Sequence, residues 1–313
     1  MTLKTEWSTA VWHLAAVLTM CVWGTTFIST KVLLLHGLTP AHIFLLRFAQ
    51  AYVGILLVEH KRWLCRDWRD ELHMLVLGVC GGSLYFLTEN TALRHTLAGN
   101  VSLEVCMAPL ITAVLAAAFR HEHHGWRLWA GSLLALGGVA LVVAQTNAVF
   151  HFNVWGDVLA LCAATLWAGY QLLTNSMTVR YGIGFTTRKV FGYGVLTILV
   201  YLAVTGPLLP SEELLASPVV VGNLLYLGIL ASLVCYLVWN QVMRRIGSVA
   251  SANYIYLNPV VTVFFSALIL HEPVTPVTLV GGGAIICGVY LAQRAGAGGS
   301  SPGSGNSDKF MRL

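Results

Sequence analysis

The sequence predicts an all-α integral membrane protein whose ten transmembrane helices form two inverted five-helix repeats. Three observations lead to this prediction: an apolar composition, apolar segments of membrane-spanning length, and an internal repeat. Of the 313 residues, 57% are hydrophobic and only 10% are Asp, Glu, Lys or Arg, whereas a soluble domain carries about 25% charged residues. So little polar surface excludes most cytosolic enzymes, nucleic-acid binders and secreted disulfide scaffolds.

Apolar segments long enough to cross a bilayer, which takes about 20 residues, follow one another along the chain. They lie near residues 12–35, 40–59, 72–93, 96–119, 127–144, 154–178, 185–207, 218–243, 247–270 and 275–293. Each is expected to be a helix, because a helix satisfies its own backbone hydrogen bonds in lipid and the alternating pattern of a membrane barrel is absent. From these segments we expect an N-terminus at 1–11, a first repeat at 12–144, an outer linker at 145–153, a second repeat at 154–293 and a flexible tail at 294–313.

The distribution of cations predicts that both termini lie in the cytoplasm. When the N-terminus is placed inside, most of the 18 Lys and Arg residues fall in inner segments, and Arg94 is alone in an outer turn. Positive charge marks the inner loops of membrane proteins. We therefore expect a multi-pass protein of the cell inner membrane. Its net charge of +5 is explained by topology and contact with anionic lipid, so no nucleic-acid partner is expected.

Residues that bind metals, form disulfides or carry enzymatic chemistry are not arranged in their usual patterns. All cysteines except Cys65 fall inside predicted helices, and no Cys-x-x-Cys pair occurs. The cluster His121, Glu122, His123 and His124 lacks the His-Glu-x-x-His spacing, so a solvated loop is favoured over a metal site. Phosphate-binding and Gly-x-Ser-x-Gly motifs are missing. We expect no cofactor, no metal and no catalytic residues.

The internal repeat aligns residues 90–144 on residues 240–294 without a gap, at a constant offset of 150. It matches residue types that are scarce in this chain. The matched pairs include Asn90 with Asn240, Arg94 with Arg244, Pro109 with Pro259, Glu122 with Glu272 and Gly131 with Gly281. Because five spans is an odd number, the second copy is expected upside down. Inverted repeats are common in secondary transporters, whose substrate site lies at the repeat interface.

A set of short motifs extends over residues 12–293. The motifs are Trp23-Gly24-Thr25-Thr26-Phe27, Pro40 through Arg47-Phe48, Asn90-x-Ala92-Leu93, Pro109 and Pro259, and Glu122 and Glu272, each nine residues before a glycine. In these motifs the chain resembles the EamA-type members of the drug/metabolite transporter superfamily, although His replaces the usual Gly before both glutamates. The resemblance implies ten helices in two inverted repeats. It also implies transport of small organic solutes, often outward, including amino acids and metabolites.

Ionisable side chains inside membrane spans are functional candidates by default. Here they are Lys31, Arg47, Glu89 and Glu104, all in the first repeat. A tight hairpin between the third and fourth spans is expected to bring Glu89 within about one turn of Glu104, so that both carboxylates face one cavity and can load and release a proton. The alternative, left equally open, is that Glu89 or Glu104 pairs with Arg47 or Lys31 and holds the bundle together.

Polar and aromatic residues on neighbouring helix faces complete the candidate site. Asn100 lies one turn before Glu104, and Asn258 one turn after Tyr254. Mid-span aromatics suit an ammonium-bearing substrate through cation–π contact, although packing alone is the more frequent use of such side chains. The candidates for substrate binding or coupling are Glu104, Glu89, Arg47, Asn100, Trp23, Trp167, Tyr85, Tyr170, Gln171, Tyr254 and Asn258. Pro109 and Pro259 are expected to be hinges or static kinks.

These observations predict a secondary active transporter that moves a small organic solute by alternating access. An amino acid or related metabolite is the expected cargo, export the expected direction, and proton coupling or exchange the expected drive. Two alternatives remain open: an integral-membrane enzyme that acts on a lipid-linked substrate, and an exporter of cationic drug-like compounds. A passive channel is disfavoured because the deep charges have no ring symmetry. The protein is expected to be a monomer or a homodimer.

Overall fold

The computed structural model describes residues 9–60, 62–95, 101, 104–120, 125–146, 154–270 and 276–297. In these residues the regular structure is helical and contains no strand. The first half comprises α1 (Thr9–Leu35), α2 (Pro40–Val58), α3 (Trp68–Gly78), α4 (Leu84–His95), α6 (Ala108–Arg120) and α7 (Trp126–Thr146). The second half comprises α8 (Val154–Tyr181), α9 (Ile183–Thr205), α10 (Glu212–Ala216), α11 (Pro218–Leu225), α12 (Cys235–Ile246), α13 (Ser248–Ala252), α14 (Asn258–Leu270) and α15 (Pro276–Ala297).

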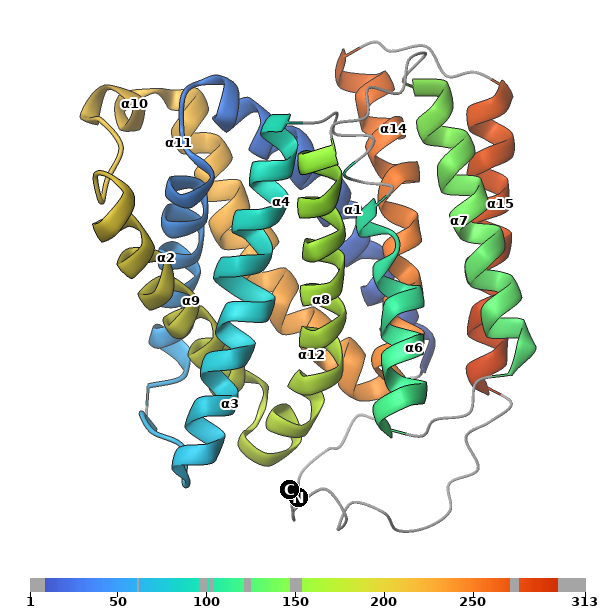
Figure 1. Ribbon diagram of the computed structural model, residues 1–313, viewed down its shortest axis with the longest axis horizontal. Helices are drawn as coiled ribbons and strands as arrows, with labels where there is room; N and C mark the ends of the chain where they lie inside the picture. Colours follow the sequence, from blue (N-terminus) through green and yellow to red (C-terminus); the bar gives the residue numbers. More distant parts are fainter. Residues whose placement is uncertain are drawn as a thin grey trace.

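The long helices stand side by side as a bundle (Figure 1). Within the described residues, six helical stretches are long and apolar enough to cross a membrane. They are Thr9–Leu35, Pro40–Val58, Trp68–His95, Val154–Tyr181, Ile183–Thr205 and Pro218–Ile246. The prediction of an all-α membrane protein is therefore confirmed. The count of ten spans stays a prediction, for which α6, α7, α14 and α15 supply the four other helices.

Turn chemistry defines the start of α2. Gly37 has φ +99°, a left-handed conformation that glycine adopts without steric cost. Thr39 then caps the helix, because its side-chain oxygen accepts a hydrogen bond from the backbone N–H of His42 at 3.2 Å. Pro40 occupies the first helical position, where its missing N–H costs nothing. These residues form one of the short breaks that separate the predicted spans.

The two repeats meet where α7 packs against α15 through glycines (Figure 1). A Cβ atom added to Gly131 would lie 2.6 Å from the carbonyl oxygen of Gly288, and one added to Gly138 would lie 2.6 Å from that of Gly281. Gly281 and Gly288 are the repeat equivalents of Gly131 and Gly138, at offset 150. Each contact is thus the symmetric mate of the other, as expected for two antiparallel helices of an inverted repeat. Small residues allow this close approach.

Both repeats interrupt their third long helix with a π-helical segment. The first segment, Val79–Ser83, joins α3 to α4, and its Gly82 has non-helical angles of φ −130° and ψ −110°. The second, Tyr226–Val234, joins α11 to α12. At offset 150 the first segment falls within the second. Such segments bend helices and often occur at functional sites.

The prolines that were expected to break helices stand at helix starts instead. Pro109 is the second residue of α6, and Pro259 is the second residue of α14. A turn at residues 106–107 precedes α6, and a 3-10 helix, Asn253–Leu257, precedes α14. In the first turn of a helix, proline removes no intrahelical hydrogen bond. The break in each of these two spans therefore lies just before its proline, and a hinge role for either proline stays a prediction.

Candidate functional site

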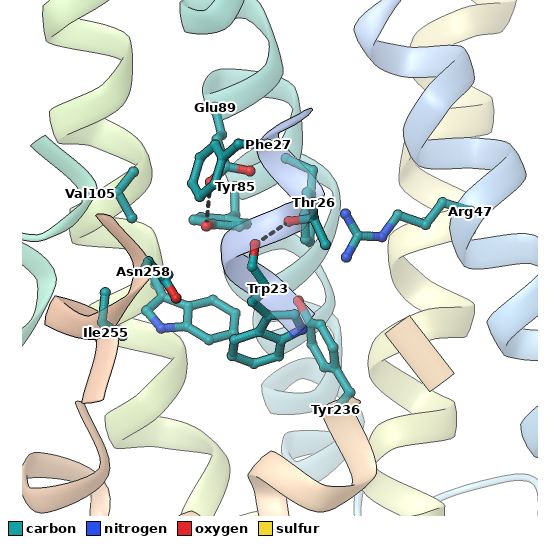
Figure 2. Close-up of a pocket in the computed structure, with 12 residues that line it drawn as sticks. Trp23, Thr26, Phe27, Arg47, Tyr85, Glu89, Val105, Tyr236, Ile255 and Asn258 are labelled. Carbon is teal, nitrogen blue, oxygen red and sulfur yellow. Dashed lines mark hydrogen bonds between the residues drawn. The ribbon is translucent and has the colours of Figure 1, made fainter. Parts of the chain in front are cut away.

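A pocket lies between the two repeats (Figure 2). Its lining combines charged, aromatic and apolar side chains from both halves of the chain. The lining residues are Trp23, Thr26, Phe27, Arg47, Tyr85, Phe86, Glu89, Val105, Trp167, Tyr236, Ile255 and Asn258. A mainly apolar and aromatic lining with a few polar groups is the composition of small-molecule sites.

Equivalent residues of the two repeats face one another in this pocket. Trp23 and Trp167 occupy matching positions in the first and sixth predicted spans, and their rings meet edge to face with centroids 5.5 Å apart. Phe86 and Tyr236 match at offset 150, and both line the pocket. The pocket therefore lies at the repeat interface, the place that inverted-repeat transporters use for their substrate.

The two charged residues of the pocket break this symmetry. Arg47 and Glu89 both come from the first repeat, and the equivalent of Glu89 at offset 150 is Trp239. The exposed fraction is 4% for Arg47 and 7% for Glu89. A buried charge is costly unless hydrogen bonds or an opposite charge compensate it. The equivalent of Glu89 in the second repeat is uncharged, so the scaffold that the two repeats share does not require a carboxylate at this position.

Each charge has a partner of its own. The hydroxyl of Tyr85 donates to Oε1 of Glu89 at 2.6 Å. Nε of Arg47 donates to Oγ of Ser232 at 2.5 Å, and the guanidinium carbon lies 4.6 Å from the centroid of the Phe86 ring. Among the described residues Arg47 and Glu89 form no ion pair with each other, although both line one pocket (Figure 2). The structural ion pair that the sequence left open is thus not adopted by these two side chains.

Trp23 belongs to a cluster of aromatic rings that forms one wall of the pocket. The centroid of the Trp23 ring is 5.7 Å from that of Tyr236 and 5.3 Å from that of Trp239, and the centroid of Trp167 is 5.2 Å from that of Tyr85. In Figure 2, Glu89 lies at one end of the pocket and Trp23 and Tyr236 lie at the other. A ligand in this pocket would have its charges near α2 and α4 and its apolar part against the rings.

The structure brings only part of the predicted set into the pocket: Glu89, Arg47, Trp23, Trp167, Tyr85 and Asn258. The hydroxyl of Tyr170 instead donates to Oδ1 of Asn240 at 2.9 Å, and that of Tyr254 contacts Nδ1 of His13 at 2.5 Å. Gln171 is fully buried outside the pocket lining. Glu104 directly precedes the lining residue Val105 and does not line the pocket itself.

Several sequence predictions fall outside the described residues. Asn100 is one of them, so its expected place one turn from Glu104 stays a prediction. The histidine loop and both repeat-matched loop glutamates are others: His121, Glu122, His123, His124 and Glu272. Lys31 is described, and its ammonium group donates to the carbonyl oxygen of Leu93 at 2.9 Å.

The apolar and hydroxyl residues of the lining, above all Phe86 and Tyr236, were not among the residues predicted from the sequence. Repeat symmetry could have found this pair, because Phe86 is adjacent to the candidate Tyr85 and matches Tyr236 at offset 150. Thr26, Phe27, Val105 and Ile255 give no such signal on their own. Val105 and Ile255 also match at offset 150, but aliphatic matches are common by chance in an apolar chain.

The sequence model of the EamA-like transporter family matches residues 10–144 and again residues 154–293. The chain belongs to this family. It is 32% identical over 292 residues to a probable terminal-alkyne amino-acid exporter of Streptantibioticus cattleyicolor, an alignment that covers 92% of this chain and 94% of the relative. It is also 32% identical over 283 residues to an uncharacterized transporter of Archaeoglobus fulgidus, covering 89% of this chain and 96% of the relative.

A more distant relative is a probable amino-acid metabolite efflux pump of Escherichia coli, 26% identical over 88% of this chain and 92% of the pump. One solved crystal structure superposes on the EamA protein with a TM-score of 0.71 over 94% of this chain and 99% of that chain. Its sequence identity is 17%, so it shows the fold alone. This member of the family is thus a multi-pass membrane transporter of a small organic solute and not an enzyme.

Proposed function

We propose that this EamA protein is a secondary active transporter that exports an amino acid or a related metabolite across the inner membrane. The observation that carries the proposal is the presence of Arg47 and Glu89 in one buried pocket without an ion pair between them. A zwitterion offers a carboxylate to the guanidinium group and an ammonium group to the carboxylate. Charge-assisted hydrogen bonds of this kind are the strong ones in binding sites.

The aromatic wall supports the same class of substrate. Trp23, Trp167 and Tyr85 can contact an ammonium group through their ring faces or pack against an apolar side chain. Two relatives whose names mention amino acids or their metabolites agree with this substrate class. Both termini lie in the cytoplasm in this proposal, as the inner basic loops predict.

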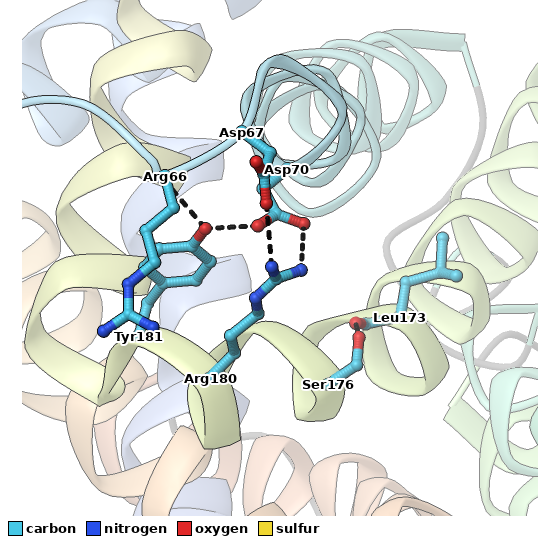
Figure 3. A network of polar contacts seen from close by, with 7 residues as sticks. All are labelled: Arg66, Asp67, Asp70, Leu173, Ser176, Arg180 and Tyr181. Carbon is cyan, nitrogen blue, oxygen red and sulfur yellow. Dashed lines mark hydrogen bonds and ion pairs between the residues drawn. The ribbon is translucent and has the colours of Figure 1, made fainter. Parts of the chain in front are cut away.

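In alternating access, contacts at one end of the bundle close the pocket in one state and separate in the other state. A polar network joins α3 to α8 (Figure 3). It lies at the end of the bundle where α1 begins (Figure 1). Arg180 forms ion pairs with Asp67 at 2.9 Å and with Asp70 at 2.7 Å, and the hydroxyl of Tyr181 donates to Asp70. The Arg180–Asp67 pair is exposed on both sides, and because exposed ion pairs contribute little stability, this contact can exchange with water at low cost. We assign the closure of the inner end to this network.

A second set of contacts joins α3 to α9 nearby. Glu71 accepts hydrogen bonds from Lys189, Tyr193 and the backbone N–H of Cys65. The first repeat thus supplies the acids and the second repeat the bases. Rocking of one repeat against the other would separate both sets at once, as in transporters built from inverted repeats.

Proton coupling is assigned to the carboxylates of the first repeat. Glu89 is the primary candidate because it lines the pocket, where a proton and a substrate ammonium group would compete for one carboxylate. Glu104 is the secondary candidate because it directly precedes a lining residue. Competition at one site is sufficient to exchange an outgoing substrate for an incoming proton.

The purified protein in proteoliposomes provides the test. Vesicles preloaded with each unlabelled amino acid should accumulate the same labelled amino acid by counterflow, and the flux should saturate. Glu89→Gln and Arg47→Gln should raise the substrate concentration needed for half-maximal counterflow about 10- to 100-fold, whereas Glu212→Gln, an exposed change in α10, should not. Counterflow of no amino acid would contradict the proposal. Transport of organic cations that survives Arg47→Gln would support the exporter of cationic drug-like compounds instead.

A further inference from the structure

Two aromatic residues of the pocket also hold the backbone of the opposite repeat. The indole N–H of Trp23, in α1, donates to the carbonyl oxygen of Ala231 at 2.8 Å. The hydroxyl of Tyr236, in α12, donates to the carbonyl oxygen of Gly81 at 2.8 Å. Both bonds are buried, and each joins a side chain of one repeat to the main chain of the other.

The two acceptors are equivalent residues of the repeats. Gly81 and Ala231 match at offset 150, and each lies inside one of the π-helical segments, Val79–Ser83 and Tyr226–Val234. The donors are not equivalents, because the counterpart of Tyr236 is Phe86, which has no hydroxyl, and Trp167 makes no hydrogen bond to either π segment among the described residues. Equivalent carbonyl groups of the two repeats thus accept hydrogen bonds from different donors, an indole N–H in one case and a phenol hydroxyl in the other.

The second repeat also packs closely against the segment Val79–Ser83. A Cβ atom on Gly81 would lie 2.1 Å from Cδ2 of Tyr170, so the ring of this second-repeat residue packs directly on the glycine backbone. Interruptions of this kind, where a side chain inserts beside the hydrogen-bond ladder, are where long helices bend. A small displacement of the Tyr236 ring would therefore be transmitted to the bend of the helix that carries Tyr85 and Glu89.

We infer that Trp23 and Tyr236 are positioning residues that couple occupancy of the pocket to the two π-helical bends, each acting on the repeat to which it does not belong. The inference rests on the proposed function, because it assumes that a ligand touches these rings. A ligand that shifts the Trp23 and Tyr236 rings moves the Ala231 and Gly81 carbonyls with them. Both repeats then change shape together, so that the pocket closes on one side of the membrane as it opens on the other.

The first test measures amide hydrogen exchange in the ligand-free protein. Tyr236→Phe removes one hydroxyl and should speed exchange about fivefold in Val79–Ser83, the effect of one lost hydrogen bond, with Tyr226–Val234 unchanged. Trp23→Phe should give the converse pattern. Trp167→Phe truncates an equivalent pocket ring by the same amount and should change neither segment. Equal effects on both segments, no effect, or an effect of Trp167→Phe like that of Trp23→Phe would overturn the inference.

The second test separates positioning from binding, with L-phenylalanine as the probe. Tyr236→Phe should lower the maximal transport rate about fivefold while Kd changes by less than about twofold. Tyr52→Phe removes the same atom from a tyrosine outside the pocket and should keep the wild-type rate. A rate and Kd that are both unchanged in Tyr236→Phe would overturn the inference. If the wild-type protein does not bind L-phenylalanine, the amino acid that shows counterflow replaces it as the probe. If no amino acid binds, the proposed substrate class is wrong, and the exchange measurement still decides the inference.

Discussion

The hydroxyl of Tyr85 donates a hydrogen bond to Oε1 of Glu89, one turn further along α4, and both side chains line the pocket at the repeat interface. An ionised carboxylate can accept about four hydrogen bonds. The bond from Tyr85 therefore fixes the carboxylate and leaves it able to accept a proton or a substrate ammonium group. The bond thus orients Glu89 and uses only part of the hydrogen-bonding capacity of its carboxylate.

The first prediction concerns this bond. Tyr85→Phe should weaken amino-acid binding about tenfold, because a hydrogen bond to a charged group is worth about 1.5 kcal/mol or more. Equilibrium binding in detergent measures the change. Tyr52→Phe removes a hydroxyl outside the pocket and should bind like wild type. Unchanged affinity in Tyr85→Phe would show that the orientation of Glu89 does not depend on Tyr85.

The second prediction concerns coupling. Glu89→Gln should remove the dependence of uptake on external pH, because the glutamine amide cannot exchange a proton. Uptake into proteoliposomes at several imposed pH gradients measures this dependence. Glu104→Gln, beside the pocket, should weaken the dependence less. Full retention of the pH response in Glu89→Gln, together with its loss in Glu104→Gln, would move the coupling role to Glu104.

The third prediction concerns the contact between α7 and α15. Gly288→Ala places a Cβ 2.6 Å from the carbonyl oxygen of Gly131. Backbone atoms cannot yield cheaply, so the change should cost about 2 kcal/mol and lower the apparent Tm by several degrees. Gly137→Ala, in α7 itself, meets nothing within 4 Å and should not lower Tm. Equal Tm values for these two variants would argue against the glycine-mediated contact.

The fourth prediction uses Cys65, which lies between α2 and α3, to report on the inner end. Burial, followed by the adjacent Glu71, raises the pKa of the Cys65 thiol to about 12, so that little reactive thiolate exists near neutral pH. When the network opens, the pKa should fall towards its ordinary value, near 8.5, and the thiolate fraction at pH 8 should rise. Maleimide labelling should therefore be slow in wild type and faster in Arg180→Gln.

This labelling is measured in a variant whose only thiol is Cys65. Arg69→Gln removes an exposed charge close by and should leave the rate unchanged. A labelling rate that is the same in wild type and Arg180→Gln would mean that the ion pairs of Arg180 do not keep the inner end closed.

Sequence reasoning found the charges of the site because such residues are rare in this chain. Arg47 and Glu89 stood out against an apolar background, and Trp23 and Trp167 stood out through the repeat. Tyr170 was expected beside Trp167 in the pocket. One turn of separation on a helix does not decide which side of an interface a ring faces, and this ring packs on Gly81 instead.

The bends were harder to predict. Prolines at 109 and 259 directed attention to the fourth and ninth spans, yet the π-helical segments lie in the third and eighth. The glycines of Val79–Ser83 are compatible with close packing as well as with irregular backbone, and sequence alone does not separate the two. Their function depends on the Tyr236 and Tyr170 side chains, which approach from the other repeat and are far away in the sequence.

The proposed substrate site is tested most directly by asking whether Arg47 binds the carboxylate and Glu89 the ammonium group of one zwitterion. Binding is compared for L-phenylalanine, its carboxamide and 3-phenylpropionate. Arg47→Gln should weaken binding of L-phenylalanine about 10- to 100-fold and leave binding of the carboxamide, which has no carboxylate, almost unchanged. Glu89→Gln should weaken L-phenylalanine similarly and spare 3-phenylpropionate, which has no ammonium group. If both variants weaken all three ligands alike, or neither weakens L-phenylalanine, the two charges do not form the substrate site.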